Sequence, residues 1–514
     1  MIINLNNLPK KNKITANVCI IGGGTVGLFL AHRLSLNNIP VTIIEAGQEE
    51  SKKFKNNTYK FKNYLNKNTL LNERFVLGGK STIWGGQMLA LQKSDVSNRK
   101  YINIKAWKIK YEEITKYFPT VMKSFNFRFL KNQSRFMSNK KKKFSFFNKD
   151  FDLRFSVFIK PKIKNFYRFF FKDIINDSQQ HIYINSKVLE INNSKNNTSV
   201  KNIIAKSNNG NTLEIETKIV IICCGALEST KLLLLYNKKN NNFIKKNTLG
   251  HFFCDQLSFI CGKFIIKDWK EFNKRFSPIY KYGLIHASRL ELKSKFQKNN
   301  KLPSAFCHFI FNHNSKYKLL KNFLKEKIYL KSIKSILAIF TEIIKIIYYL
   351  FYFRILNGRV WFNKPSEVLL SINVEQIPNF NNRIFIKKNR LATNWKIKNR
   401  EISDVKLISK TFENAWKKSK LNKIAELKMN VPKNSNAKHL INIGYHPIGT
   451  IRIGSSELES VVDKNLKLWN ISNLYICSTA IFPTSGSSNT GLTLLALTAR
   501  LATHLKNIIN LKYI

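Results

Sequence analysis

Acidic residues are scarce in this sequence. Its 514 residues hold 30 aspartates and glutamates against 88 lysines and arginines, which gives a formal net charge of +58. An excess of this size is typical of proteins that bind nucleic acids or anionic membranes. Here, however, the lysines are spread along the whole chain together with asparagine, isoleucine and phenylalanine, which share A/T-rich codons. We therefore interpret the charge as a mutational bias and predict no specific nucleic-acid partner.

The chain also lacks the cysteine spacing of a disulfide framework or a zinc site. Its seven cysteines include no C-x-x-C pair, and several lie within apolar, strand-like runs. This pattern predicts buried, reduced thiols in a cytoplasmic protein, with no metal site. Residues 1–21 contain no continuous apolar run followed by a small-residue cleavage site, so the sequence predicts no secretory signal.

No hydrophobic run is both long and uncharged enough to read clearly as a membrane span. The nearest candidate is Ser335–Phe353, which carries Glu342 and Lys345 near its middle. A charge at the centre of a spanning helix costs roughly 2.5–3.5 kcal/mol. The segment is therefore expected to be a buried, groove-lining or interfacial helix, with at most a peripheral membrane contact.

What the sequence does contain, near its start, is a dinucleotide-binding fingerprint. The apolar run Val18–Ile21 predicts a buried parallel strand, and the glycines that follow it fit the pattern G-x-G-x-x-G. In such a unit Gly22 permits the tight turn, Gly24 lets the backbone approach a pyrophosphate, and Gly27 lets helix and strand pack closely. A second apolar strand ends at Glu45, whose carboxylate can accept hydrogen bonds from ribose hydroxyls. The fingerprint alone does not separate NAD from FAD.

Three further stretches have the composition of loops that approach a ligand. In residues 76–88, "VLGGKSTIWGGQM", two glycine pairs bracket Trp84, which indicates backbone close to something flat or anionic. Residues 218–235 read as a strand, a small-residue turn and a helix, and residues 473–505 as a strand, a polar loop and an apolar helix. The segment "HPIGT" begins at His446. Its local sequence leaves open whether this histidine is structural, a metal ligand or a general base.

In this order, these stretches resemble the glucose-methanol-choline (GMC) family of FAD-dependent oxidoreductases, and within it the bacterial, pyranose-oxidase-like branch. The resemblance touches nearly the whole chain. Beyond the two glycine-rich loops it rests on "WKIKYEEITKYF" (107–118), "CCGALESTKLLL" (223–234), "LGHFFCDQLSF" (249–259), "VEQIPNFNNRIFI" (374–386) and "HPIGTIRIG" (446–454). The last of these has Ile453 where the family has methionine.

The resemblance implies an α/β fold, α+β overall, in which a Rossmann-like FAD-binding domain is interleaved with a substrate domain built on an antiparallel sheet with helices. The FAD-binding domain would comprise residues 1–94, 178–256 and 438–514. The substrate-binding domain would comprise residues 95–177 and 257–437. In this fold the glycine fingerprint and His446 meet around one flavin. A membrane span at 335–353, between them in sequence, would put them on opposite sides.

By the same resemblance, a small-molecule alcohol gives a hydride to flavin N5, and the catalytic pair is His446 and Asn489. His446 would take the hydroxyl proton, because histidine is readily poised near neutral pH, and Asn489 would hold the substrate oxygen. The FAD would be bound non-covalently, since Ile83 stands where tethering branches carry a histidine. The implied cofactor contacts are Gly22, Gly24, Thr25, Gly27, Glu45, Ala46, Gly78, Gly79, Ser81, Trp84, Val188, Cys224, Gly225, Ala480 and Thr490.

The chain departs from the family pattern in places. After Asn489 the usual Pro-Thr is replaced by Thr490-Gly491, and His251 and Gln256 stand where Arg and His are common. Three histidines of the substrate segments are candidates for the pocket wall: His286, His308 and His313.

Two alternative functions stay open. One is the same fold in a non-redox role, such as a lyase, and the other is a basic membrane-associated protein with structural FAD. Within the oxidoreductase reading, the motif "EQIPN" favours a sugar, a polyol or a secondary alcohol of a biosynthetic intermediate. The sequence does not indicate the electron acceptor.

Overall fold

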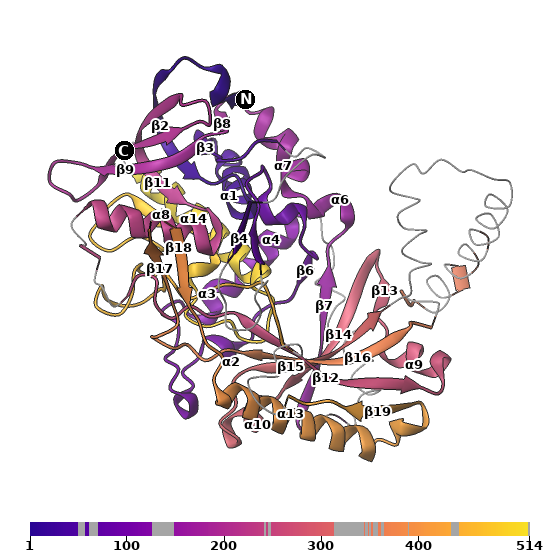
Figure 1. The fold of residues 1–514 in the computed structure, drawn as a ribbon. Helices are drawn as coiled ribbons and strands as arrows, with labels where there is room; N and C mark the ends of the chain where they lie inside the picture. Colours follow the sequence, from indigo (N-terminus) through magenta and orange to yellow (C-terminus); the bar gives the residue numbers. More distant parts are fainter. Residues whose placement is uncertain are drawn as a thin grey trace.

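The computed structural model shows two lobes, each built around one β-sheet (Figure 1). It describes residues 1–49, 57–60, 70–125, 147, 149–240, 243–244, 248–312, 344, 348, 351–352, 358–360, 364–388, 390–432 and 441–511. Short elements outside the two main sheets are the hairpins β4 (Asn57–Lys60) with β5 (Leu70–Glu73) and β17 (Arg383–Lys387) with β18 (Arg390–Asn394), and the helices α2 (Lys93–Val96), α6 (Pro161–Lys164), α9 (Trp269–Phe276) and α10 (Ser294–Asn299).

The first sheet has eight strands with a parallel centre. Its order is β1 (Ile2–Asn4), β8 (Gln180–Ile184), β3 (Val41–Ile44), β2 (Lys11–Ile21), β11 (Thr212–Ile222), β10 (Val200–Lys206) and β9 (Lys187–Asn193), with β21 (Leu474–Ile476) also beside β11. Neighbours from β1 to β11, and the β11–β21 pair, are parallel. The run Val18–Ile21 of β2 is buried, as its continuous β-branched and apolar residues require at the centre of a covered sheet. The parallel strand predicted there is confirmed.

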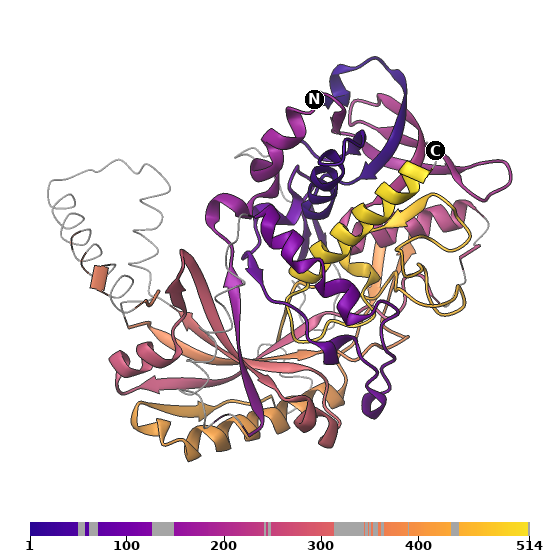
Figure 2. The same cartoon turned by 180° about the vertical axis from the view of Figure 1, so that it is seen from behind.

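Helices flank the first sheet (Figure 1), and some of them contact one another through aromatic side chains. They are α1 (Thr25–Ser35), α3 (Tyr111–Thr115), α4 (Phe118–Ser124), α7 (Phe166–Ile175), α8 (Gly225–Lys239) and α14 (Thr490–Leu511). α1 contacts α7 and α14, and α14, seen best from behind in Figure 2, also contacts α3 and α4. The ring centroids of Phe29 and Phe125 each lie 5.9 Å from that of Phe170. This aromatic cluster fixes α1, whose first turn follows the end of β2.

The second sheet is antiparallel throughout and has nine strands. Its order is β19 (Ala425–Met429), β12 (Gln256–Ile266), β16 (Glu367–Glu375), β15 (Ala305–Asn312), β14 (Leu284–Leu292), β7 (Phe151–Phe158) and β6 (Gln87–Met88), with β13 (Ile279–Lys281) beside β14 and β20 (Ile441–Ile443) beside β12. The long helix α13 (Asn399–Lys418) covers one face, where Phe412 and Trp416 share a core with Ile372. Because side chains alternate along a strand, Asn373 and Glu375 of β16 lie on the opposite face.

The strands of the first sheet come from three distant parts of the chain, residues 2–44, 180–222 and 474–476. The predicted fold class, an interleaved Rossmann-like unit beside an antiparallel sheet with helices, is therefore confirmed. β6 and β20, which lie in segments predicted to bind FAD, pair with the second sheet instead. Where the domain boundaries fall stays a prediction.

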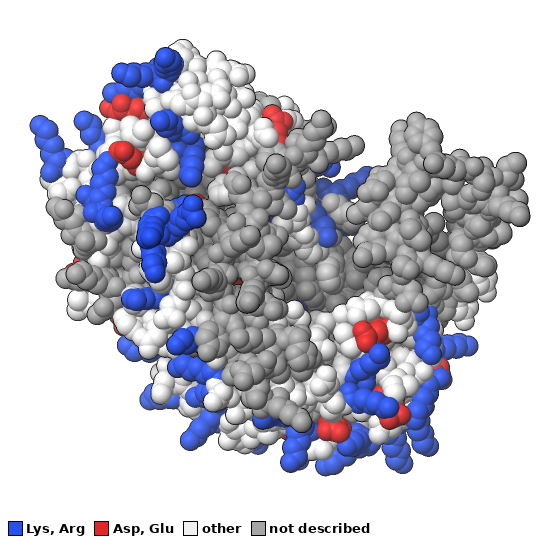
Figure 3. All heavy atoms as spheres, in the orientation of Figure 1, with Lys and Arg blue, Asp and Glu red and all other residues white. Residues whose placement is uncertain are grey.

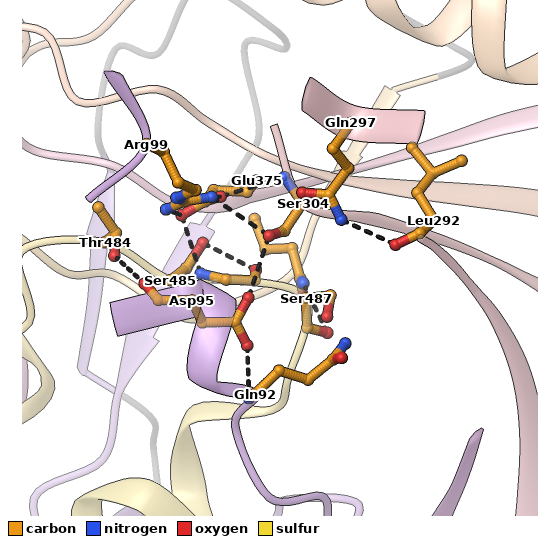
Figure 4. A network of polar contacts seen from close by, with 12 residues as sticks. Gln92, Asp95, Arg99, Leu292, Gln297, Ser304, Glu375, Thr484, Ser485 and Ser487 are labelled. Atoms are coloured by element: carbon orange, nitrogen blue, oxygen red, sulfur yellow. Dashed lines mark hydrogen bonds and ion pairs between the residues drawn. The ribbon is translucent and has the colours of Figure 1, made fainter. Parts of the chain in front are cut away.

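A buried ion pair lies beneath the loop Thr484–Asn489 (Figure 4). The side chains of Arg99 and Glu375 are 2% and 0% exposed, and the guanidinium donates to both carboxylate oxygens. Glu375 Oε1 also accepts the backbone N–H of Gly486 at 2.9 Å. Gly486 has a φ of +61° and lies so close to Asp95 that a Cβ there would overlap the carboxyl group. Only glycine fits this turn of the loop.

A second buried carboxylate holds the next residue of the same loop. Glu291 of β14 accepts hydrogen bonds from Ser487 Oγ at 3.1 Å and from Arg154 Nη1 at 2.8 Å. It also accepts one from the side chain of Gln92. Glu375 and Glu291, from two strands of the antiparallel sheet, thus hold consecutive loop residues and determine where α14 begins.

Lysine and arginine side chains are spread over both lobes on the face shown in Figure 3, with few acidic side chains between them. Within the residues that the structure describes, no helix is long and apolar enough to cross a membrane. Of the predicted helix 335–353, only Ile344, Tyr348 and residues 351–352 are described, so that prediction lies outside the described residues. The peripheral membrane contact stays a prediction.

Neutralising Glu375 should weaken the junction between the lobes. Glu375→Gln leaves the Arg99 guanidinium buried without its counter-ion, and breaking one partner of a buried pair typically costs about 3–5 kcal/mol. We expect the free energy of unfolding, measured by urea titration with circular dichroism, to fall by that order. The matched control is Glu112→Gln, which breaks a solvent-exposed pair with Lys93 and should leave the urea midpoint in place. Equal shifts in both variants would contradict the role of the buried pair.

Candidate active site

A cavity of about 800 Å³ opens where the parallel strands of the first sheet end. Its wall includes Ile21 at the end of β2 and Gly22 just after it, Ile44 at the end of β3, and Cys223 just after β11. Parallel α/β sheets bind their ligands at this edge, outside the carboxyl ends of the strands. The predicted site residues that line the cavity are Gly22, Gly24, Thr25, Glu45, Ala46, Gly79, Trp84, Val188, Cys224, Gly225, His446, Asn489 and Thr490.

The three fingerprint glycines are needed for different reasons. Gly22 has a φ of +104° and donates its N–H to the carbonyl of Ile44 at 2.8 Å. A Cβ on Gly27 would overlap the carbonyl oxygen of Gly22, so the turn and the first helical turn of α1 require both glycines. A Cβ on Gly24 would meet only Gly79 Cα, at 4.0 Å. The fold therefore tolerates a side chain at position 24. We infer that glycine is needed there because a ligand approaches the backbone closely.

Glu45 is a buried carboxylate at the end of β3. Its Oε2 accepts the N–H of Gly23 at 2.8 Å and its Oε1 accepts the N–H of Gly47 at 2.7 Å. Burial raises the pKa of Glu45 to about 7, and the two backbone hydrogen bonds partly oppose that rise. Each carboxylate oxygen keeps a further acceptor site. Because Glu45 also lines the cavity, it can accept hydrogen bonds from a hydroxylated ligand.

The second glycine loop, residues 76–88, is hydrogen-bonded to the first. Gly78, with a φ of +90°, donates its N–H to Gly23 O at 2.8 Å. Ser81 is 1% exposed; its hydroxyl donates to Gly78 O at 2.6 Å and accepts the N–H of Phe166 at 3.0 Å. Gly78 and Ser81, both predicted cofactor contacts, are absent from the cavity wall and support the loop instead. Gly79 lies on the wall, directly against Gly24.

Trp84 explains one departure from the family pattern. Its ring N–H donates to Lys164 O at 2.8 Å, and its ring meets Phe166 edge-on with centroids 5.7 Å apart. A Cβ on Gly491 would lie 3.2 Å from Trp84 Cζ3. Glycine at position 491 therefore gives this indole room beside the first turn of α14, which begins at Thr490.

His446 follows β20 and lies on the cavity wall as a half-buried side chain. Its backbone N–H donates to Asp255 Oδ1 at 2.9 Å. Its ring Nδ1 is buried near Gly444 and has no hydrogen-bond partner among the described residues. The partly exposed ring edge is therefore the one that carries Nε2. Burial, together with the nearby cations Arg289 and Lys80, lowers the pKa of His446 to about 4, so the imidazole is neutral at neutral pH.

Asn489 ends the loop Thr484–Asn489 and lines the same cavity. Its Oδ1 accepts a hydrogen bond from Arg289 Nη2 at 2.8 Å, and Arg289 Nη1 donates to Ser487 O at 3.0 Å. Arg289 lies on β14 of the other lobe and is 3% exposed. Sequence reasoning missed this residue. The only signal for it is a charged residue at alternate positions of an otherwise apolar strand, "SRLEL" (288–292), where a pair of inward charges is unusual.

The other predicted residues have structural partners. Gly27 and Ala480 are absent from the cavity wall, and Ala480 O accepts the N–H of Ile451 at 2.9 Å. His251 Nδ1 pairs with Phe380 O at 3.0 Å, and Gln256 reaches Ser487 O at 3.4 Å. His286 and His308 are not on the cavity wall, and His313 lies outside the described residues. No cluster of three metal-ligating side chains occurs in the described part of the chain.

Residues 386–498 match the family model described as GMC oxidoreductase, and this stretch contains both His446 and Asn489. This C-terminal part of the chain is therefore similar to GMC oxidoreductases. A comparison with curated protein sequences finds no match.

Solved structures agree with this chain over nearly its whole length. Pyridoxine 4-oxidase from Mesorbium loti is 13% identical, with 95% of this chain and 99% of that chain covered and a TM-score of 0.63. A formate oxidase from Aspergillus oryzae, studied for FAD modification, is 14% identical, with 96% and 98% covered and a TM-score of 0.61. An FAD-dependent oxidoreductase from Chaetomium thermophilum is 14% identical, with 96% and 100% covered and a TM-score of 0.60. At these identities the likeness shows the fold.

Replacing Gly24 and Gly27 with alanine, one at a time, should show which of them the stability of the fold requires. Gly27→Ala forces α1 away from β2, and overpacking of this kind costs about 1–3 kcal/mol. Gly24→Ala meets no atom closer than 4.0 Å and should leave the urea midpoint unchanged. Unfolding of both variants under matched conditions tests this. Equal loss of stability would show that Gly24, too, is required by the fold.

Proposed function

We propose that this protein is an FAD-dependent oxidoreductase that oxidises the CH–OH group of a small alcohol, namely a sugar, a polyol or a secondary alcohol of a biosynthetic intermediate. The observation that carries the proposal is the shared cavity. A neutral imidazole, His446, and a side-chain amide, Asn489, lie on the wall of the cavity that the glycine fingerprint also lines. The family is one of oxidoreductases, and two of the similar structures are described with FAD.

The residues of the cavity fit FAD. The N-terminus of α1 at Thr25 offers unpaired N–H groups to a pyrophosphate, and Gly24 leaves its backbone open to close approach. Glu45 presents acceptors for ribose hydroxyls. Cofactor sites of about 300–1,000 Å³ are usual, and this cavity falls within that range. The flavin would lie against the second glycine loop at Gly79 and reach the wall formed by His446.

When bound, FAD supplies the hydride acceptor. His446 is neutral, so its free ring nitrogen can take the substrate hydroxyl proton without first losing a proton of its own. The amide of Asn489 offers a hydrogen bond to the substrate oxygen from the same wall. Thr490 begins α14, whose positive N-terminal end favours negative charge developing on this side of the cavity.

Replacing the proposed base should slow flavin reduction without releasing the flavin. Loss of a general base typically costs about 10²–10⁴-fold in rate, so His446→Ala should reduce that much more slowly in anaerobic stopped flow. The substrate is the alcohol that bleaches the flavin fastest in a dye-coupled screen. The control is His504→Ala, because His504 is a half-buried residue of α14 that is absent from the cavity wall, and this variant should reduce at the normal rate. If His446→Ala reduces as fast as the unaltered protein, the proposal fails.

The pH dependence of the flavin reduction rate should reflect the lowered pKa of His446. A base acts when unprotonated, and a pKa of about 4 for His446 means that protonation begins only well below neutral pH. The rate should therefore stay level from pH 8 to pH 6 and fall as the pH approaches 4. An acid limb centred at the ordinary histidine pKa of about 6.5 would contradict the environment described for His446.

The FAD should be bound non-covalently, because Ile83 offers no nucleophile at the position expected for a tether. Acid precipitation should release the yellow cofactor into the supernatant, and flavin retained in the pellet would refute the point.

Gly24→Ala should fold normally yet bind FAD more weakly, because its methyl group occupies the space of the pyrophosphate. FAD affinity can be measured by titration of the apoprotein. Unchanged affinity would remove Gly24 from the site.

A further inference from the structure

Arg289 is a buried cation whose hydrogen bonds, among the described residues, go to neutral acceptors. Its two terminal nitrogens donate to Ser487 O at 3.0 Å and to Asn489 Oδ1 at 2.8 Å. The guanidinium carbon lies 4.0 Å above the ring centre of Phe306, which closes one face of the group from water. The nearby carboxylate of Glu291 accepts hydrogen bonds from Arg154 and Ser487 at Oε2, and acts on Arg289 through space without a hydrogen bond to it. The positive charge of Arg289 therefore lies against the end of the loop, at Ser487 and Asn489.

The contact with Arg289 fixes which way the Asn489 amide faces. A guanidinium has only donors, whereas a side-chain amide has an oxygen acceptor on one branch and an NH₂ donor on the other. The amide oxygen must therefore face Arg289, since the NH₂ group would put donor against donor. Asn489 also lines the cavity, so the branch left to face it is the NH₂ group.

We propose that Arg289 is a positioning residue of the reaction: by holding the Asn489 oxygen it keeps the NH₂ group turned toward the substrate oxygen. The inference rests on the proposed function and adds a residue from the other lobe to it. A donor aimed at an oxygen that is losing its proton stabilises the charge that develops there, and loss of one such donor typically costs about 10²–10³-fold in rate. With the amide reversed, its carbonyl would face the oxygen lone pairs and oppose the reaction.

Arg289 also acts on His446 through space. The charged or titratable groups around this imidazole are Asp255, which binds its backbone N–H, Lys80 of the second glycine loop, and Arg289 of β14. Both cations lower the pKa of His446 and keep it available as a base. Removing the cation at position 289 should therefore let His446 take up a proton at higher pH, an effect that a merely structural arginine would not produce.

The kinetic test uses FAD-loaded protein and the alcohol identified by the dye-coupled screen. Arg289→Met should slow flavin reduction by about 10²-fold with little change in apparent substrate binding, because the contact acts in the transition state. Asn489→Asp keeps an acceptor for Arg289 but lacks the NH₂ donor, so it should be slowed to a similar extent while remaining folded. Measured at about pH 8, where His446 stays unprotonated in every variant, the double variant Arg289→Met/Asn489→Asp should be no slower than Asn489→Asp alone, because both changes remove the same interaction.

The control is Arg359→Met. Arg359 is also a buried arginine, 6% exposed, and donates to the backbone carbonyls of Ser277 and Lys274. It lies beside β13, away from the cavity wall, so its loss should leave the rate of flavin reduction unchanged. A second readout does not depend on turnover. Titration of ¹³C-labelled histidine by NMR should show the His446 signal, identified by its absence in His446→Ala, moving to higher pH in Arg289→Met and staying in place in Arg359→Met.

The outcomes separate this inference from the function on which it rests. If His446→Ala reduces flavin normally, the proposed function fails whatever Arg289 does. If His446→Ala is slow but Asn489→Asp reduces at the normal rate, the NH₂ donor is not used and the inference alone fails. It also fails if the losses of Arg289→Met and Asn489→Asp multiply in the double variant. Asn489→Asp keeps the test decisive even if Arg289→Met does not fold.

Discussion

The candidate site depends on how the loop Thr484–Asn489 is held. Backbone and side-chain groups in this loop find partners on the antiparallel sheet: Glu375 takes the N–H of Gly486, and Glu291 takes the hydroxyl of Ser487. These partners stand at fixed positions of β16 and β14, so the register of the second sheet determines where the loop lies. The loop in turn leads directly into α14 and places Asn489 on the cavity wall. The two lobes therefore build one site together, and neither sheet would define it alone.

The use of buried charges for this purpose has a physical cost. Taking an ion pair out of water costs several kcal/mol for each ion, and a well-packed apolar cluster would often be as stable. What the pairs of Arg99 with Glu375 and Arg154 with Glu291 add is direction, because each carboxylate accepts hydrogen bonds only from donors at particular angles. We interpret the retained charges as fixing one loop geometry. That interpretation also fits Gly486, whose left-handed backbone and contact with Asp95 leave the loop one way to turn.

The parts of the molecule that sequence could predict are those where one local requirement decides the residue. The strand Val18–Ile21, the turn at Gly22 and the helix packing at Gly27 each follow from backbone geometry, and each is found in the structure. The same motifs do not distinguish residues that face the cavity from residues that support it. Ser81 is buried behind its loop, and its burial depends on Phe166, which is far away in sequence.

Long-range contacts were beyond sequence reasoning for the same reason. Arg289 lies 200 positions from Asn489, and no local pattern ties the two. The motif "EQIPN" favours a class of substrate by resemblance, yet in the structure its Glu375 holds a loop and is absent from the cavity wall. The motif therefore has a structural role through Glu375, and this role does not depend on the substrate.

The departure at Thr490-Gly491 shows how such constraints are coupled. A proline at the first position of α14 would preset the backbone for a helix start, whereas here Thr490 begins the helix without it. Gly491 is the residue that meets Trp84, and a side chain there would press on an indole that is already held by Lys164 and Phe166. The start of α14 is thus determined from two sides, by the carboxylates that hold the loop before it and by the tryptophan beside its first turn. Asn489 lies between these two constraints. Its position needs no help from a proline, which is why the departure from the family pattern is compatible with an intact site.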